Sequence, residues 1–318
     1  MMERASRAAN PSLRNRGYHT TPTTGVFGAA VAAGKLLGLD ARRLTSALAM
    51  AGAQSAGLME MYGPSMQKRF NPAPAARAGV TGALMAKLGF TGTALVFEGE
   101  RGWLNAYSDK RFPQSLEKGL EVPYQLDIEF KPYSCARPIH NAIDCALAIR
   151  AQPGFNAAKL TAIGVERHED WSNYHRNPTP ATYHEAQVSL PFSVAVAMLE
   201  GKALLEQYSE RNIRNKEVRR LAGLAKVETV GGLPRGVSVR ISATQSDGRK
   251  FVSQVDYPKG SIRNSMSDAE LLAKFNSLAA PVLGSKKALA LADAAMNVEK
   301  IANIADLMKL AATGRAAR

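Results

Sequence analysis

Cysteine is nearly absent from this 318-residue sequence, which holds only Cys135 and Cys145. Two cysteines are too few for a disulfide framework, and no secretory signal is visible, so we expect a protein of the reducing cytoplasm. Long apolar runs are missing as well, since no stretch approaches the roughly 18 residues that suggest a membrane-spanning helix. The apolar fraction of 46% is ordinary for a globular protein. Composition therefore predicts a globular chain with no membrane partner.

Acidic residues are the second shortage. Aspartate and glutamate number 27 against 41 lysines and arginines, which leaves a net charge of +14. A basic protein can bind nucleic acid, attract small anions, or simply stay in solution. The basic residues are spread along the chain without an RNA-binding aromatic motif or zinc-finger spacing, so nucleic acid ranks last among the partners we expect. The charge is compatible with an acidic substrate but does not identify one.

Metal-binding and phosphate-binding patterns are also lacking. His168, His175 and His184 do not form a metal set, because His184 has no second histidine four residues further on. The pair Gly231-Gly232 is typical of a turn rather than of a phosphate loop. Cys135 is better interpreted as a small buried side chain than as a nucleophile. We therefore expect no metal and no cofactor.

Residues 1–16 are rich in arginine and alanine and contain one acid, Glu3. They lack the apolar segment of a secretory signal, and Pro11 would interrupt a helix. We expect this segment to be a frayed leader.

Helical patterns fill residues 24–110. Asp40 is predicted to cap a helix over 41–56, in which apolar residues recur at helical spacing. A second alanine-rich helix is predicted over 75–88, with Gly89 ending it. Helices this rich in alanine and glycine are typical of tightly packed bundles.

The middle of the chain changes character, because alternating apolar residues predict strands over 159–169, 226–230, 236–244 and 250–257. The last two strands flank the tetrapeptide 246–249 (Ser-Asp-Gly-Arg), which is typical of a hairpin turn. Two helices are predicted among them, one after His140 and one over 189–199.

The end of the chain returns to helix. Residues 267–270 (Ser-Asp-Ala-Glu) resemble a capping box, and 288–312 have apolar periodicity. We predict a mainly α protein with an α+β part, arranged as a helical domain interrupted by a smaller lid. The expected domains are 1–125 (first part of the helical domain), 126–262 (α+β lid) and 263–318 (returning part of the helical domain).

Several separated motifs, taken together, resemble the MmgE/PrpD family, which includes 2-methylcitrate dehydratases, cis-aconitate decarboxylases and iminodisuccinate epimerases. The motifs occur in the order of the family and are the segments 17–40, 67–80, 89–99, 130–144, 184–191 and 258–260. Together the resemblance covers 17–312. It implies a helical domain built from both ends of the chain, an inserted α+β lid, a homodimer, and lyase chemistry without a metal.

The sequence departs from the family in three ways. The family's N-terminal helical region, with its Asp- and His-bearing active-site segment, is absent. Asn71 occupies a place where relatives often have histidine, and Ala136 lies where decarboxylase-like members have another histidine. These departures suggest a truncated homologue, for which a separately encoded N-terminal helical piece is a conceivable partner.

The resemblance also implies roles for individual residues. His19, which precedes a small-residue helix, and Tyr174 match residues that move protons, while Lys68 and Lys131 match lysines that neutralise carboxylates. Arg69 is expected to assist Lys68. His140 matches a histidine of the second domain and is expected to take a catalytic part in the cleft, supporting either role. It stands four residues before Asp144, so the two would share a helical face.

We therefore expect a metal-independent hydro-lyase that acts on a small di- or tricarboxylate such as 2-methylcitrate. Dehydration requires a base for a C–H proton, an acid for the leaving hydroxyl and cations for the carboxylates. A cis-aconitate decarboxylase or an epimerase could use nearly the same residues, although the lack of histidine at Ala136 disfavours the decarboxylase. An inactive fragment that binds carboxylates, or that only supports a dimer, is the remaining alternative.

Overall fold

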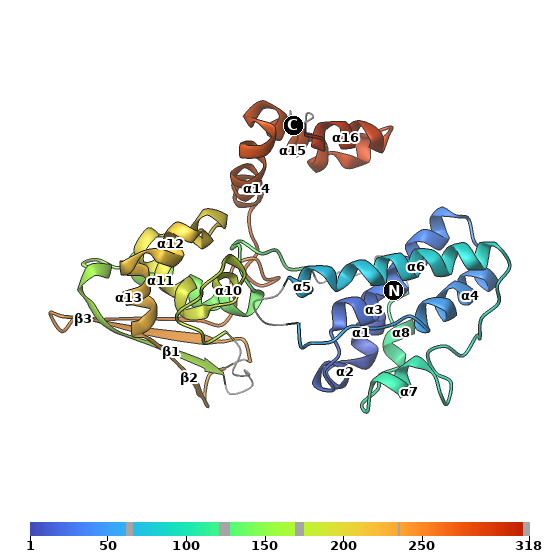
Figure 1. Cartoon of the computed structure of the whole chain (residues 1–318), viewed down its shortest axis with the longest axis horizontal. Helices are drawn as coiled ribbons and strands as arrows, with labels where there is room; N and C mark the ends of the chain where they lie inside the picture. Colours follow the sequence, from blue (N-terminus) through green and yellow to red (C-terminus); the bar gives the residue numbers. More distant parts are fainter. Residues whose placement is uncertain (62–65, 121–127, 169–174, 235, 314–318) are drawn as a thin grey trace. The chain divides into compact units, whose positions relative to one another are not determined.

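A computed structural model describes residues 1–61, 66–120, 128–168, 175–234 and 236–313. The chain is mostly helical, with 54% of it in helices, and has one small four-stranded mixed sheet. This confirms the predicted fold class. The chain divides into two compact units, Met1–Leu126 and Asp127–Arg318, and each is described by itself (Figure 1).

The described residues of the first unit form helices joined by loops, with one isolated β-bridge between Tyr18 and Leu58. Its helices are α1 (Met2–Ala9), α2 (Ser12–Asn15), α3 (Thr20–Leu36), α4 (Ala41–Gly52), α5 (Gln67–Phe70), α6 (Pro72–Lys87), α7 (Trp103–Tyr107) and α8 (Gln114–Glu117). As predicted, the Asp40 carboxylate caps α4, accepting the N–H of Arg43 at 2.8 Å. Helix α6 begins at Pro72, earlier than predicted, because proline is tolerated in a first turn whose N–H groups need no helical partner.

Helices α3 and α6 lie side by side at a separation that only small residues allow. A Cβ atom added to Gly79 of α6 would lie 2.5 Å from both the carbonyl oxygen of Val26 and the Cβ of Ala29 in α3. Gly82 is similarly close to α4, where a Cβ would meet the carbonyl oxygen of Ala47 at 3.0 Å. The high alanine and glycine content noted in the sequence thus serves helix packing.

The expectation of a frayed leader is wrong. Residues 2–9 form α1, and its alanines at positions 5, 8 and 9 are fully buried in the core of the first unit, as is Leu13 of α2. The Ser108 hydroxyl donates to the carbonyl of Ala9 at 2.8 Å, and the Phe112 N–H donates to the carbonyl of Ala8 at 2.8 Å. Alanines at helical spacing bury one face while the arginines remain on the other.

The second unit combines helices with the sheet. Its helices are α9 (His140–Arg150), α10 (Tyr183–Gln187), α11 (Leu190–Glu200), α12 (Glu210–Arg214), α13 (Lys216–Leu224), α14 (Asp268–Leu283), α15 (Ser285–Met296) and α16 (Ile304–Ala311), and its strands are β1 (Leu160–His168), β2 (Ala225–Val230), β3 (Val239–Gln245) and β4 (Lys250–Val255). All four predicted strands are present.

The sheet has the order β2-β1-β3-β4, in which β1 and β2 are parallel and the other pairs antiparallel. Alternate residues of β1 and β3 are buried, including Ile163, Val165 and Ile241, because α9, α11 and α13 pack against the sheet. Helix α11 is buried along most of its length, which explains its nearly continuous apolar sequence. The predicted hairpin joins β3 and β4, with Gly248 at φ +82°.

The predicted capping box also forms: Ser267 accepts the N–H of Glu270, and the Glu270 carboxylate accepts the N–H of Ser267 at 2.8 Å. It starts α14, which continues to Leu283. Helices α14, α15 and α16 belong to the second compact unit, which extends to Arg318. That they return to the first helical domain stays a prediction, as do the limits 126–262 of the lid.

Replacing Gly79 by alanine tests the close approach of α3 and α6. We expect the G79A variant to lose about 1–3 kcal/mol of unfolding free energy, because the helices must separate to admit the methyl group. The matched control is G223A in α13, where an added Cβ meets nothing within 4 Å. That variant should gain up to about 1 kcal/mol from helix propensity. Urea denaturation followed by circular dichroism measures both, and equal effects would contradict the packing argument.

Candidate active site

His19 is held at the N-terminal end of α3 by contacts on both sides. Its backbone N–H donates to the carbonyl of Gly57 at 3.0 Å, and its own carbonyl accepts the Thr23 hydroxyl at 2.8 Å. The ring nitrogen Nδ1 lies 3.2 Å from the amide nitrogen of Asn71. The side chain is half-buried. These contacts fix both the backbone and the plane of the imidazole.

Asn71 joins α5 to α6 and is itself buried. Besides His19, its side-chain nitrogen lies 3.4 Å from the carbonyl oxygen of Leu58 and 3.1 Å from the sulfur of Met61. Leu58 and Met61 therefore complete the surroundings of this amide.

The charge around His19 is positive. Burial lowers the pKa of His19, and the nearby charges of Lys68 and then Arg14 lower it further. Lys68 lies half-buried in α5, and its neighbour Arg69 is exposed. The structure thus brings together His19 and Lys68, two of the residues singled out from the sequence, in a site that favours a neutral imidazole and can attract an anion.

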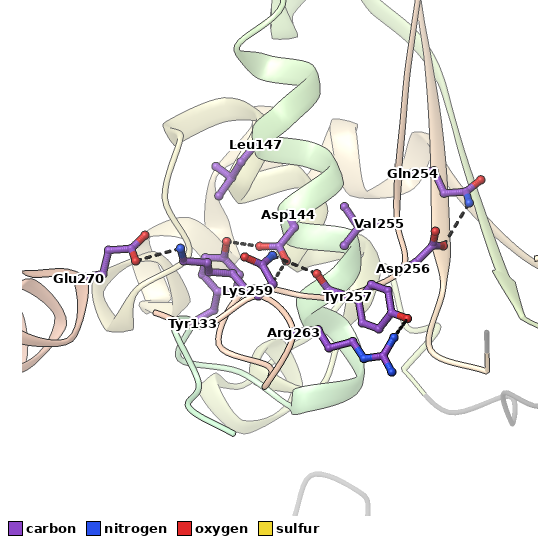
Figure 2. A pocket seen from close by; sticks show the side chains of 11 residues that line it. Tyr133, Asp144, Leu147, Gln254, Val255, Asp256, Tyr257, Lys259, Arg263 and Glu270 are labelled. Carbon is purple, nitrogen blue, oxygen red and sulfur yellow. Dashed lines mark hydrogen bonds and ion pairs between the residues drawn. The ribbon is translucent and has the colours of Figure 1, made fainter. Parts of the chain in front are cut away.

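A second polar group lies in the second unit, around a pocket of about 600 Å³ (Figure 2). Asp144 of α9 accepts a hydrogen bond from the Tyr133 hydroxyl and another from the backbone N–H of Lys259 at 2.7 Å. The Lys259 side chain pairs with Glu270 at 2.9 Å. Burial raises the pKa of Asp144, although the hydrogen bonds from Tyr133 and Lys259 lower it. Burial also raises the pKa of the Tyr133 hydroxyl, and the nearby Asp144 carboxylate raises it further.

His140 is the first residue of α9 and is fully buried. Neither of its ring nitrogens has a well-aligned hydrogen-bond partner among the described residues, although the Cys135 backbone is close enough to oppose the lowering of its pKa. The ring packs edge-on against Tyr133 at 5.2 Å between centroids. Burial, followed by the charges of Arg137 and Lys131, lowers the pKa of His140 to about 3. His140 and Asp144 lie one turn apart on α9, as expected from their spacing. Asp144 is hydrogen-bonded to Tyr133 and Lys259 and not to His140.

Lys131 is exposed, and its backbone carbonyl accepts a hydrogen bond from the Lys274 ammonium. Burial, and then the charge of Lys131, lower the pKa of Lys274, so the two lysines lie near each other. The preceding residue, Phe130, donates its backbone N–H to the carbonyl of Gly260 at 2.9 Å. Position 260 has a φ of +83° and lies against the Phe130 carbonyl, so it has no room for a side chain. Tyr174, the other predicted proton-transfer residue, lies outside the described residues.

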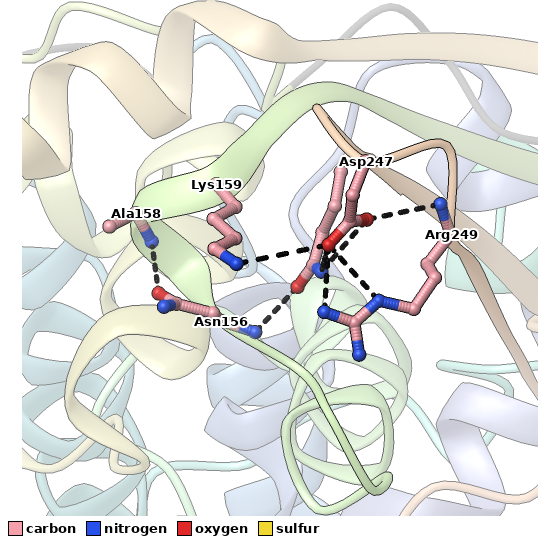
Figure 3. Close-up of polar contacts among 6 residues, drawn as sticks. Asn156, Ala158, Lys159, Asp247 and Arg249 are labelled. Carbon is pink, nitrogen blue, oxygen red and sulfur yellow. Dashed lines mark hydrogen bonds and ion pairs between the residues drawn. The ribbon is translucent and has the colours of Figure 1, made fainter.

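A third polar cluster, at the tip of the β3–β4 hairpin, is structural (Figure 3). Asp247 accepts hydrogen bonds from the Arg249 guanidinium at 2.7 Å and pairs with Lys159 at 3.9 Å. Hydrogen bonds from the Arg249 side chain hold the pKa of Asp247 well below its usual range. Asn156 donates its backbone N–H to Gln245 at 2.6 Å, which ties the hairpin to the segment before β1.

Three contacts escaped the sequence analysis: Asn71 on His19, Tyr133 on Asp144, and the backbone N–H of Lys259 on the same carboxylate. Asn71 was noted only as a departure from the family. In each case the partners are far apart in sequence or belong to loops without periodicity. Across the described ranges, no group of three or more His, Cys, Asp or Glu residues is arranged to hold a metal ion. Within the same ranges, no helix has the length and apolarity needed to cross a membrane.

Comparison with known proteins assigns the family. Residues 3–115 match the MmgE/PrpD N-terminal domain, and residues 133–300 match the MmgE/PrpD C-terminal domain. The chain therefore belongs to the MmgE/PrpD family. Its N-terminal match begins inside α1, in agreement with the folded state of that segment.

Relatives are found among cis-aconitate decarboxylases. The chain is 27% identical to the cis-aconitate decarboxylase-like protein oryM of Aspergillus oryzae, over 94% of this chain and 66% of the relative. It is 28% identical to the cis-aconitate decarboxylase of Homo sapiens, over 92% of this chain and 62% of the relative. It is 27% identical to the cis-aconitate decarboxylase of Aspergillus terreus, over 94% of this chain and 65% of the relative. The chain thus spans just under two thirds of the length of these relatives.

The buried His140 should make stability depend on pH. Because its folded pKa is about 3, the unfolded state binds the proton first as pH falls below the ordinary histidine value of 6.5. Stability is then fully present above pH 6.5 and should decline toward pH 3 by about 1.4 kcal/mol per unit. Replacing His140 by leucine should remove this part of the slope. Urea denaturation at pH 7, 6, 5 and 4 measures it, and equal slopes for both proteins would show that His140 takes up its proton while folded.

Proposed function

We propose that this chain carries a lyase site for a small di- or tricarboxylate and that His19 and Lys68 form its centre. The observation that supports the proposal is their juxtaposition at the starts of two helices. His19 occupies the N-cap position of α3, and Lys68 lies in α5, which directly precedes α6. A lysine charge, a polar imidazole and the positive ends of helix dipoles together suit a substrate with several carboxylates.

Decarboxylation of cis-aconitate is the reaction that the relatives' names favour. In that reaction one C–C bond breaks and carbon dioxide leaves. The electron pair of the broken C–C bond forms a new double bond. The electron pair of the original double bond moves to its far carbon, where the neighbouring carboxylate shares the negative charge. One proton then binds that carbon, which yields an unsaturated dicarboxylate. The residues must therefore hold carboxylates, stabilise a growing negative charge and deliver one proton.

The proposed roles follow from these needs. Lys68 binds a substrate carboxylate, with Arg69 assisting, and His19 acts on the oxygen that gains charge. The family resemblance also implies a carboxylate-binding role for Lys131 and a proton-transfer role for Tyr174, and both stay predictions. We propose a supporting role for His140, because its full burial against Tyr133 suits positioning better than contact with substrate.

Dehydration of 2-methylcitrate is the second candidate. It is favoured by Ala136, which is buried and lies where the family resemblance implies a histidine in decarboxylase-like members. It would additionally need a base for a C–H proton. Homodimerisation, and restoration of the site by a separately encoded N-terminal helical piece, stay predictions.

Substitution of Lys68 tests the proposed site. The full chain would be offered cis-aconitate, 2-methylcitrate and citrate separately, with carbon dioxide release and product mass as readouts. We expect carbon dioxide from cis-aconitate, and we expect K68A to lower kcat/KM by about 10²-fold because a preorganised cation is lost. The matched control is K87A, which removes an exposed lysine at the end of α6 and should leave activity unchanged.

The decarboxylase and the dehydratase give distinct results in this assay. Ultraviolet absorbance appearing from 2-methylcitrate without carbon dioxide would select the dehydratase. A folded wild-type chain that is inactive toward all three acids would contradict the proposed lyase. Equal loss in K68A and K87A would remove Lys68 from the site.

A further inference from the structure

The contact between Asn71 and His19 joins an amide nitrogen, which donates hydrogen bonds, to a ring nitrogen that can accept one. Asn71 is buried, and its amide nitrogen faces two acceptors besides His19, the carbonyl oxygen of Leu58 and the sulfur of Met61. A backbone carbonyl can only accept a hydrogen bond. The side-chain nitrogen of Asn71, and not its oxygen, must therefore point into this corner.

The same nitrogen lies 3.2 Å from Nδ1 of His19. The amide nitrogen carries two hydrogens for its three neighbours and can accept none, so a protonated Nδ1 would face a donor. A lone pair on Nδ1 avoids this conflict, and in a neutral imidazole the proton then lies on Nε2. We propose that Asn71 is a positioning residue that fixes His19 as the tautomer protonated on Nε2. His19 then presents an N–H group, and not a basic lone pair, to a substrate.

The surroundings of His19 support the neutral form. Protonation of Nδ1 would set two donors against each other across the 3.2 Å contact. It would also add a positive charge beside Lys68 and Arg14, at the N-terminal end of α3. The groups that face this imidazole therefore disfavour a second ring proton. This agrees with the direction in which its pKa moves.

The inference rests on the proposed function only for its catalytic meaning. In the proposed lyase, Nε2–H donates a hydrogen bond to the carboxylate oxygen that gains charge. A neutral histidine in this role needs no change of protonation during the reaction. The base required for dehydration would have to be another group, so the inference favours decarboxylation over dehydration.

Nitrogen NMR of the histidine rings tests the tautomer directly. The full chain has five histidines, and the H19Q variant identifies the signals of His19. At pH 7 we expect long-range proton–nitrogen correlations to show Nε2 protonated and Nδ1 unprotonated. A protonated Nδ1 in the wild-type chain would overturn the inference without the need for any variant at Asn71.

Two substitutions then test whether Asn71 sets this state. In N71D the carboxylate can only accept, so Nδ1 should become protonated, whereas N71L, of similar size, should leave a mixture of the two neutral tautomers. Circular dichroism checks that each variant is folded. If N71D is folded and keeps an unprotonated Nδ1, Asn71 does not determine the tautomer and the inference fails.

The pH profile of activity separates this inference from the proposed function. Wild-type kcat should stay level as His19 loses its second proton, because the neutral ring still carries Nε2–H. In N71D only the imidazolium carries that hydrogen, so kcat should fall about tenfold per pH unit above its raised pKa. A wild-type chain with the expected tautomer but no turnover would contradict the lyase alone. Turnover with a protonated Nδ1 would contradict the tautomer alone.

Discussion

The close packing of α3 against α6 is the constraint on which the candidate site depends. His19 immediately precedes α3 and Asn71 immediately precedes α6, and these two residues touch. Further along, Gly79 meets Val26 and Ala29. The two helices therefore run in the same direction with their N-terminal ends together. A larger residue at position 79 would change the contact that orients His19, although it lies two turns away.

Many helix ends and turns of the fold could be predicted because short, local sequence patterns determine them. Asp40, the hairpin turn at 246–249 and the capping box at Ser267 act over four residues or fewer, so their signals are complete within a short window. The leader was misjudged for a related reason. Its arginines suggest a solvated segment, whereas Ala5, Ala8 and Ala9 are buried because α1 packs against both α3 and α8. The Ser108 hydroxyl, about a hundred residues away, also bonds to the carbonyl of Ala9.

The candidate site was predicted as a set of residues but not as a set of contacts. Resemblance to the family indicated His19 and Lys68, and both lie near one another in the first unit. It could not indicate that Asn71, a departure from the family, bonds to the His19 ring. Likewise, helical spacing placed Asp144 on the face of His140, but loop residues 133 and 259 provide its partners. Loops carry no periodicity from which such contacts can be inferred.

The positive surroundings of His19 have two effects that act in opposite directions. They attract carboxylates, and they also lower the pKa of His19, so its imidazole is a poor carrier of positive charge at neutral pH. A division of roles resolves the conflict. In the proposed site, Lys68 would provide the charge, His19 would provide a neutral N–H group held by Asn71, and the proton for carbon would come from elsewhere. A decarboxylase needs only these three functions, whereas a hydro-lyase also needs a base, which this corner of the first unit does not favour.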